Sequence, residues 1–146
     1  MRQNIRRAFP SAVHLLLIKE DRLLLLRRKN TGYMDGYLSV VAGHLEGNET
    51  VHAAAKREAL EEAGIQLDEQ DLAIVGVMHR REDDERIDWF LTVSRWSGQI
   101  CNAEPDKCEE LVWHPLAELP PDIIPYVRRG IDNYMNGKAF DSFGFH

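Results

Sequence analysis

Short apolar runs recur along the chain, and most are bounded by charged residues or glycine, as strands separated by turns are. In all, the pattern predicts strands at residues 11–19, 23–28, 37–41, 72–80, 87–96 and 111–114. The charged segment 81–86 predicts a solvated hairpin tip, since it lacks the spacing and the glycine of an EF-hand calcium loop. The stretch after Asn136 predicts no element.

Two segments have the pattern of helices. Residues 51–63 are rich in alanine, Thr50 precedes them as a plausible N-cap, and Gly64 follows where a left-handed residue often ends a helix. Residues 123–135 place apolar side chains on one face, with Pro125 in the first turn, where proline is tolerated. Strands before, between and after two helices predict an α/β fold with a mixed sheet covered on both faces.

Composition limits the classes of protein and partner. A chain of 146 residues predicts a single domain, residues 1–146. The net charge of −6 argues against a nucleic-acid polymer as partner, because phosphate contacts need Lys and Arg, but a small nucleotide remains compatible with it. Cys101 and Cys108 form no disulfide framework or zinc pattern, which favours a cytoplasmic protein. No apolar run is long enough to span a membrane, and residues 12–18 are interpreted as a strand rather than a signal peptide.

Three acidic residues gather near the end of the first helix. Glu58, Glu61 and Glu62 fall within an arc of roughly 100° on one face. Glu58 repels Glu62 across one turn of the helix. All three carboxylates also lie near the negative end of the helix dipole, which destabilises the helix by about 0.3–1 kcal/mol for each exposed acid. Two interpretations remain open at this point: a solvated acidic face, or a site for a hard divalent cation such as Mg²⁺.

The residues upstream favour the second interpretation. The segment 43–65 matches the pattern G-x5-E-x7-R-E-U-x-E-E-x-G-U, where U is a bulky aliphatic residue, with Ala59 smaller than usual. This is the Nudix box, and the chain resembles the Nudix hydrolases, especially their small MutT-like members. It differs from the common Pro-Gly-Gly of the family in having Ala42-Gly43-His44. The resemblance implies a Nudix-type α/β/α sandwich with a mixed central sheet and a loop-helix-loop catalytic motif.

The resemblance also implies a metal site. Glu58 and Glu62 are the expected ligands of Mg²⁺, with Mn²⁺ as an alternative, and Glu61 is a ligand or the general base. Glu49 would support the metal or its water shell, and the carbonyl of Gly43 is a further expected ligand.

Further residues are expected to complete catalysis and binding. Arg57 would pair with a loop carboxylate and fix the box. Glu104 follows Trp96-Ser97-Gly98 at the offset of an additional acid in MutT-like members, so it is a candidate ligand or base. Its rivals are Glu109 and Glu110, and a solvated loop acid is the alternative for all three.

Candidate substrate contacts lie near the box and at two tryptophans. His44 adjoins the box, and Arg28 ends a strand just before it, so both are candidates for phosphate binding. Trp113 is a candidate for stacking on a base, as is Trp89, although a core role suits either tryptophan better.

The expected activity is hydrolysis of a pyrophosphate bond in a nucleoside diphosphate linked to another group, X. The downstream markers of ADP-ribose, diadenosine-polyphosphate and NADH hydrolases are absent, and the short chain favours a nucleoside triphosphate, normal or oxidised, cut to monophosphate and pyrophosphate. The alternatives are an ADP-ribose or nucleotide-sugar pyrophosphatase, and a non-catalytic nucleotide-binding module. The family resemblance also raises the expectation of a homodimer.

Overall fold

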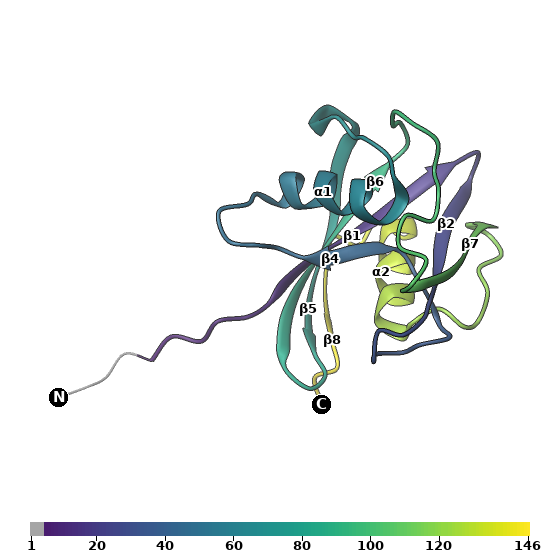
Figure 1. The fold of residues 1–146 in the computed structure, drawn as a ribbon. Helices are drawn as coiled ribbons and strands as arrows, with labels where there is room; N and C mark the ends of the chain where they lie inside the picture. Colours follow the sequence, from purple (N-terminus) through teal and green to yellow (C-terminus); the bar gives the residue numbers. More distant parts are fainter. Residues whose placement is uncertain (1–4) are drawn as a thin grey trace.

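A computed structural model describes residues 5–146; residues 1–4, which the single-domain prediction includes, lie outside the described part. A short 3-10 helix spans Glu69–Asp71. The elements in chain order are β1 (Ser11–Lys19), β2 (Arg22–Arg28), β3 (Leu38–Ser39), β4 (Val41–His44), α1 (Val51–Ala63), β5 (Leu72–Arg81), β6 (Glu85–Val93), β7 (Cys108–Pro115), α2 (Pro125–Met135) and β8 (Phe140–Phe143), as Figure 1 shows.

The sheet is mixed, as predicted. Its strands follow the order β3-β2-β1-β6-β5-β8, while β4 pairs with β1 and β7 pairs with β2. β1 runs parallel to β6, and β5 runs parallel to β8, whereas the other pairs are antiparallel. The pairing of β1 with both β4 and β6 brings the start of the Nudix-like motif to the centre of the molecule.

Alternate residues of the central strands supply two separate cores. In β1, Val13, Leu15 and Leu17 pack in the cluster on the α1 side, whereas Leu16 belongs to the cluster on the α2 side. This follows from the alternation of side chains along a strand. The small alanines of α1 let that helix lie close to one face, and α2 covers the other face. The predicted α/β/α arrangement is therefore confirmed, and neither helix is long and apolar enough to cross a membrane.

Helix α1 begins and ends where the sequence predicts. The hydroxyl of Thr50 accepts a hydrogen bond from the amide of Ala53 at 3.0 Å, and Gly64 has a left-handed φ of 69°. Several strand predictions need correction. The strand predicted at 37–41 is two short strands, because Leu38 pairs with β2 whereas Val41 pairs with β1. β6 ends at Val93 rather than at residue 96, and β7 is longer than predicted.

The tail contains a strand that the sequence pattern misses. β8 pairs with β5, and its Asp141 is buried. The carboxylate of Asp141 accepts hydrogen bonds from Arg129 and Asn133 of α2 and from Lys138. A strand of four residues with a buried acid has no hydrophobic signature, so tertiary contacts rather than local pattern define it.

The close approach of α2 to β6 gives a stability prediction. A Cβ added at Gly130 would overlap the buried ring of Phe90. Gly130→Ala gains up to about 1 kcal/mol of helix propensity, but overpacking of a core costs about 1–3 kcal/mol. We expect a net fall in the free energy of unfolding, measured by urea denaturation. Phe90→Leu should relieve the overlap, so the double variant should lose less than the sum of the two single variants.

Candidate active site

The guanidinium of Arg57 joins the loop before α1 to the helix itself. Its Nε donates to Oε2 of Glu49 at 2.7 Å, and its Nη2 donates to Oε1 of Glu49 at 3.0 Å and to the carbonyl of His44 at 3.0 Å. Its Nη1 donates to Oε1 of Glu58 at 2.7 Å. The expected pairing of Arg57 with a loop carboxylate is therefore present in the structure.

The carboxylate of Glu49 is bound on both oxygens by groups of the protein. Besides the two bonds from Arg57, its Oε1 accepts the amide of Glu46 at 2.9 Å. The hydrogen bonds from Arg57, followed by that from the Glu46 amide, lower the pKa of Glu49 to about 2. Glu49 is thus ionised at neutral pH and holds the loop against the helix, while its predicted metal role stays a prediction.

Glu58 and Glu62 form a close pair of carboxylates on successive turns of α1. Glu58 is buried, and its carboxylate lies against the backbone of Gly43, where any Cβ would overlap it. Glu62 Oε1 accepts the amide of Ala42 at 3.4 Å. Burial, and then the neighbouring carboxylate of Glu58, raise the pKa of Glu62 well above its usual range. Glu61, on the same helix, is half-exposed.

Glu104 reaches this pair because its loop is bound to the end of α1. The amide of Cys101 donates to the carbonyl of Ala63 at 3.0 Å, and the amide of Ala103 donates to that of Glu62 at 3.2 Å. These bonds satisfy carbonyls that a helix end leaves without partners. Glu104 and Glu62 line the same cavity, and the charge of Glu104 makes a small contribution to the raised pKa of Glu62. The rival Glu110 instead pairs with Arg27 at 2.8 Å.

A cavity of about 840 Å³ collects most of the predicted residues. Gly43, His44, Arg57, Glu58, Glu61, Glu62, Glu104 and Arg28 all line it. Trp113 does not: it stacks on Trp96, with ring centroids 6.4 Å apart, and packs against the core on the α1 side. Trp89 likewise packs against that core and donates from Nε1 to Ser11 at 2.7 Å.

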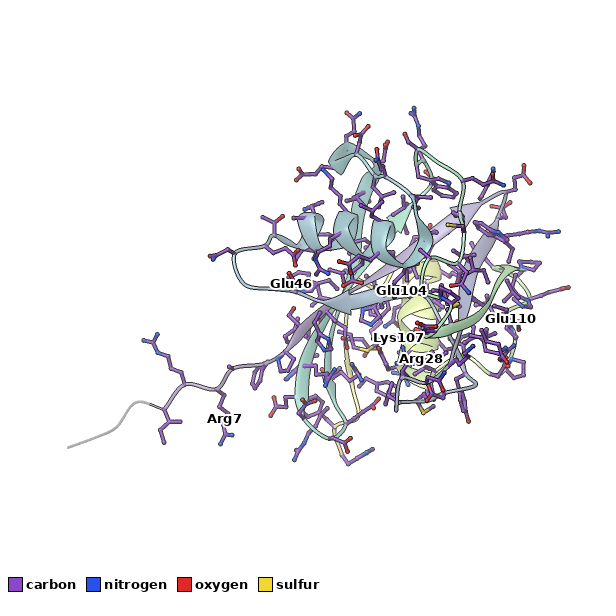
Figure 2. All side chains as sticks on the ribbon, viewed as in Figure 1. Arg7, Arg28, Glu46, Glu104, Lys107 and Glu110 are labelled. Atoms are coloured by element: carbon purple, nitrogen blue, oxygen red, sulfur yellow. The ribbon has the colours of Figure 1, made fainter. Side chains whose placement is uncertain are left out.

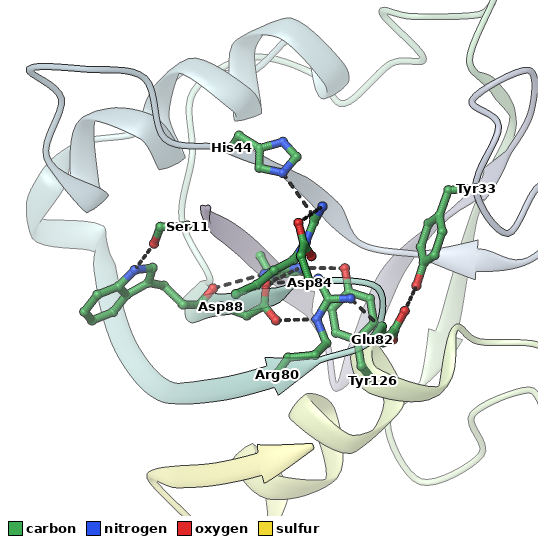
Figure 3. Close-up of polar contacts among 11 residues, drawn as sticks. Ser11, Tyr33, His44, Arg80, Glu82, Asp84, Asp88 and Tyr126 are labelled. Carbon is green, nitrogen blue, oxygen red and sulfur yellow. Dashed lines mark hydrogen bonds and ion pairs between the residues drawn. The ribbon is translucent and has the colours of Figure 1, made fainter. Parts of the chain in front are cut away.

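A second polar group on the cavity wall, shown in Figure 3, was not predicted from the sequence. Arg80 is only 4% exposed; its Nε donates to Asp88 at 2.7 Å, and its guanidinium carbon lies 3.6 Å from the ring centroid of Tyr126. The hydroxyl of Tyr126 is 3.0 Å from Nε2 of His14, whose pKa is lowered by burial to about 4. His14 and Arg80 each lie in an otherwise ordinary strand pattern, and only the position of Arg80 just before the charged hairpin tip gave a weak signal.

The hairpin tip also faces the cavity. Glu82 Oε2 accepts a hydrogen bond from the hydroxyl of Tyr33, and Arg86 pairs with Asp84 and lies 3.2 Å from Nε2 of His44. The interpretation of residues 81–86 as a merely solvated turn is incomplete, since Glu82, Asp84 and Arg86 line the cavity.

The carboxylates fit a hard divalent cation. Glu58 and Glu62 present carboxyl oxygens to one another, and the space beside Gly43 exists only because that residue lacks a Cβ. A cation bound by carboxylate oxygen would offset the burial and the neighbouring carboxylate of Glu58 that together raise the pKa of Glu62. Across residues 5–146, no three His, Cys, Asp or Glu side chains converge as a ready ligand set, so the pair and the backbone of Gly43 are the donors that the geometry offers.

Comparisons with known proteins identify the family. A model of the NUDIX domain matches residues 8–134, and the chain therefore belongs to the NUDIX family. The protein is a Nudix pyrophosphohydrolase acting on nucleoside diphosphate-X compounds.

Solved structures share the fold. A MutT NUDIX hydrolase from Burkholderia pseudomallei has a TM-score of 0.79 and 23% identity, over 86% of this chain and 98% of the other. A MutT protein from Methanosarcina mazei Go1 has a TM-score of 0.76 and 18% identity, over 91% and 97%. A bifunctional NMN adenylyltransferase/ADP ribose pyrophosphatase from Francisella tularensis, complexed with AMP and a Mn ion, has a TM-score of 0.71 and 21% identity, over 92% of this chain and 43% of the other.

The buried pair of Arg80 and Asp88 gives a second stability prediction. Asp88→Asn removes the fully buried carboxylate from Arg80 and leaves only Glu82, whose side chain is about one-third exposed, as an ion-pair partner at 3.3 Å, and breaking such a buried pair costs roughly 3–5 kcal/mol. Asp84→Asn is the matched control, because it removes the same charge from the exposed pair with Arg86, and such pairs are worth about 0–1 kcal/mol. Urea denaturation of both variants measures the difference. Equally small losses would show that Asp88 does not hold Arg80 in the fold.

Proposed function

We propose that the protein hydrolyses a nucleoside triphosphate, normal or oxidised, to monophosphate and pyrophosphate with Mg²⁺. The observation that carries this proposal is the pair of buried Glu58 and half-buried Glu62 beside Gly43, in a cavity that Glu104 also lines and that is large enough for a nucleotide. Mn²⁺ is the alternative cation. A cytoplasmic location and a homodimer remain predictions from the sequence.

The proposed reaction assigns different roles to the acidic residues of the cavity. Glu58 and Glu62 would hold the cation, which would neutralise phosphate charge and polarise the reacting phosphorus. Arg57 fixes Glu58 from one side and leaves its carboxylate turned to Gly43. Glu61 is half-exposed on the same helix and Glu104 also lines the cavity, which supports either carboxylate as the group that takes a proton from the attacking water.

Two other functions keep some support. The similarity to a bifunctional ADP ribose pyrophosphatase makes ADP-ribose the first alternative substrate, with nucleotide sugars beside it. A non-catalytic nucleotide-binding module is less compatible with the site, because binding alone does not require three carboxylates on one helix face.

The decisive experiment is a substrate panel. Purified protein with Mg²⁺, or with Mn²⁺, is mixed with canonical and oxidised nucleoside triphosphates, ADP-ribose and nucleotide sugars, and products are separated by chromatography. Pyrophosphate from a triphosphate is the expected result. AMP with ribose phosphate, from ADP-ribose alone, would replace the proposed substrate, and no turnover of any compound would favour the binding module.

Glu62→Gln tests the carboxylate pair in catalysis. The change keeps size and helix propensity but removes a charged ligand, so we expect turnover to fall by roughly 100-fold or more. Glu118→Gln is the matched control, because Glu118 is exposed and does not line the cavity. Normal turnover in a folded Glu62→Gln variant would remove Glu62 from the site.

Thermal melting tests cation binding without substrate. Millimolar Mg²⁺ should raise the melting temperature of the wild type, because an ion that binds only the folded state stabilises it. The Glu62→Gln variant should melt higher than the wild type without metal, since its repulsion with Glu58 is gone, and should gain little from Mg²⁺. Equal Mg²⁺ shifts in both proteins would contradict binding at this pair.

A further inference from the structure

Most cationic side chains of the cavity are already neutralised within the protein. Arg27 pairs with Glu110 and Asp122, and the remaining paired arginines bind carboxylates in the same way. They are Arg57 with Glu49 and Glu58, Arg80 with Asp88, and Arg86 with Asp84. Within residues 5–146, two cations of the cavity, Arg28 and Lys107, form no ion pair.

These two cations come from adjacent segments. Arg28 ends β2 and stands opposite Cys108 of β7, while the amide of Lys29 donates to the carbonyl of Lys107 at 3.0 Å. Arg28, Lys107 and Glu104 all line the cavity, and Figure 2 labels them in the same part of the molecule. The amide of Lys107 donates to the carbonyl of Glu104 at 2.9 Å, so the loop that brings Glu104 to the carboxylate pair also brings Lys107.

Arg28 is held in place from one side only. Its Nε donates to the carbonyl of Tyr33 at 2.8 Å, and its Nη2 donates to the hydroxyl of Thr31 at 2.9 Å. Its guanidinium carbon lies 5.6 Å from the ring centroid of Tyr33. These neutral partners orient the guanidinium without cancelling its charge, and they leave Nη1 as a donor for a ligand.

We propose that Arg28 and Lys107 bind the terminal phosphate of the substrate, as a pair of uncompensated cations beside the carboxylate site. The proposal rests on the proposed triphosphate function. Two free positive charges match a terminal phosphate, which carries nearly two negative charges at neutral pH, better than a bridging phosphate, which carries one. The pair would therefore favour nucleoside triphosphates over ADP-ribose and nucleotide sugars, whose phosphates are all bridging.

Lys107→Gln tests the pair in kinetics. Lys107 is exposed, so its replacement leaves the fold intact, and Lys107→Arg keeps the charge. Loss of one charge-assisted contact predicts a rise of about tenfold in KM for a triphosphate, with kcat little changed and a smaller effect on any ADP-ribose cleavage. Lys19→Gln is the matched control, because Lys19 is an exposed lysine outside the cavity.

The expected pattern is a raised KM in Lys107→Gln, near-normal KM in Lys107→Arg, and no change in Lys19→Gln. A KM in Lys107→Gln equal to that of the control would overturn the proposal while leaving triphosphate hydrolysis in place. An unselective loss that is the same for triphosphate and ADP-ribose would overturn the assignment to a terminal phosphate.

A second measurement does not need turnover. Inorganic tripolyphosphate with EDTA should raise the melting temperature of the wild type and of Lys19→Gln, and this shift should shrink in Lys107→Gln. If the panel shows no triphosphate cleavage but this pattern appears, the proposed substrate fails and the anion site stands. Shifts of equal size in Lys107→Gln and wild type, or no shift in any of them, would overturn the anion site itself.

Discussion

The arrangement of the active site depends on a single guanidinium that joins the acidic loop to the acidic helix. Glu49 and Glu58 would repel each other if they were brought together alone, and Arg57 donates to both, as well as to the carbonyl of His44. With the loop held in this way, Gly43 lies directly against the carboxylate of Glu58. The hydrogen-bonding capacity of Glu49 is then used within the protein, which leaves Glu58 and Glu62 as the carboxylates that face inward together.

The C-terminal end of α1 also depends on contacts with a loop, here through backbone hydrogen bonds. A helix leaves its last carbonyls without partners, and here the amides of Cys101 and Ala103 bind those of Ala63 and Glu62. These backbone hydrogen bonds hold the loop that contains Glu104 against the end of α1, near Glu62. The loop therefore serves both the backbone of the helix end and the cavity, because Glu104 would not be held at the cavity if the loop left the helix end.

The sequence predicted the elements whose signal is local and missed those that tertiary contacts define. Thr50 and Gly64 bound α1 through their own chemistry, and the spacing of Glu58, Glu61 and Glu62 placed all three on the cavity side. By contrast, β8 is stabilised by contacts of Asp141 with α2, and Arg80 is recognisable as a cavity residue only beside Asp88 and Tyr126. Trp113 was predicted at the cavity but does not line it, because its ring stacks on Trp96 instead.

Charge pairing explains why this cavity suits a polyanion despite the net charge of −6. Long-range attraction does not favour a nucleotide here, so affinity has to come from groups at the site. The buried carboxylates require a cation to become attractive to phosphate, and the paired arginines are already neutralised. Selectivity among phosphate compounds then depends on Arg28 and Lys107, the cavity cations that no carboxylate within residues 5–146 neutralises. The ion-pair partners of each cation therefore say more about phosphate binding than the total number of cations does.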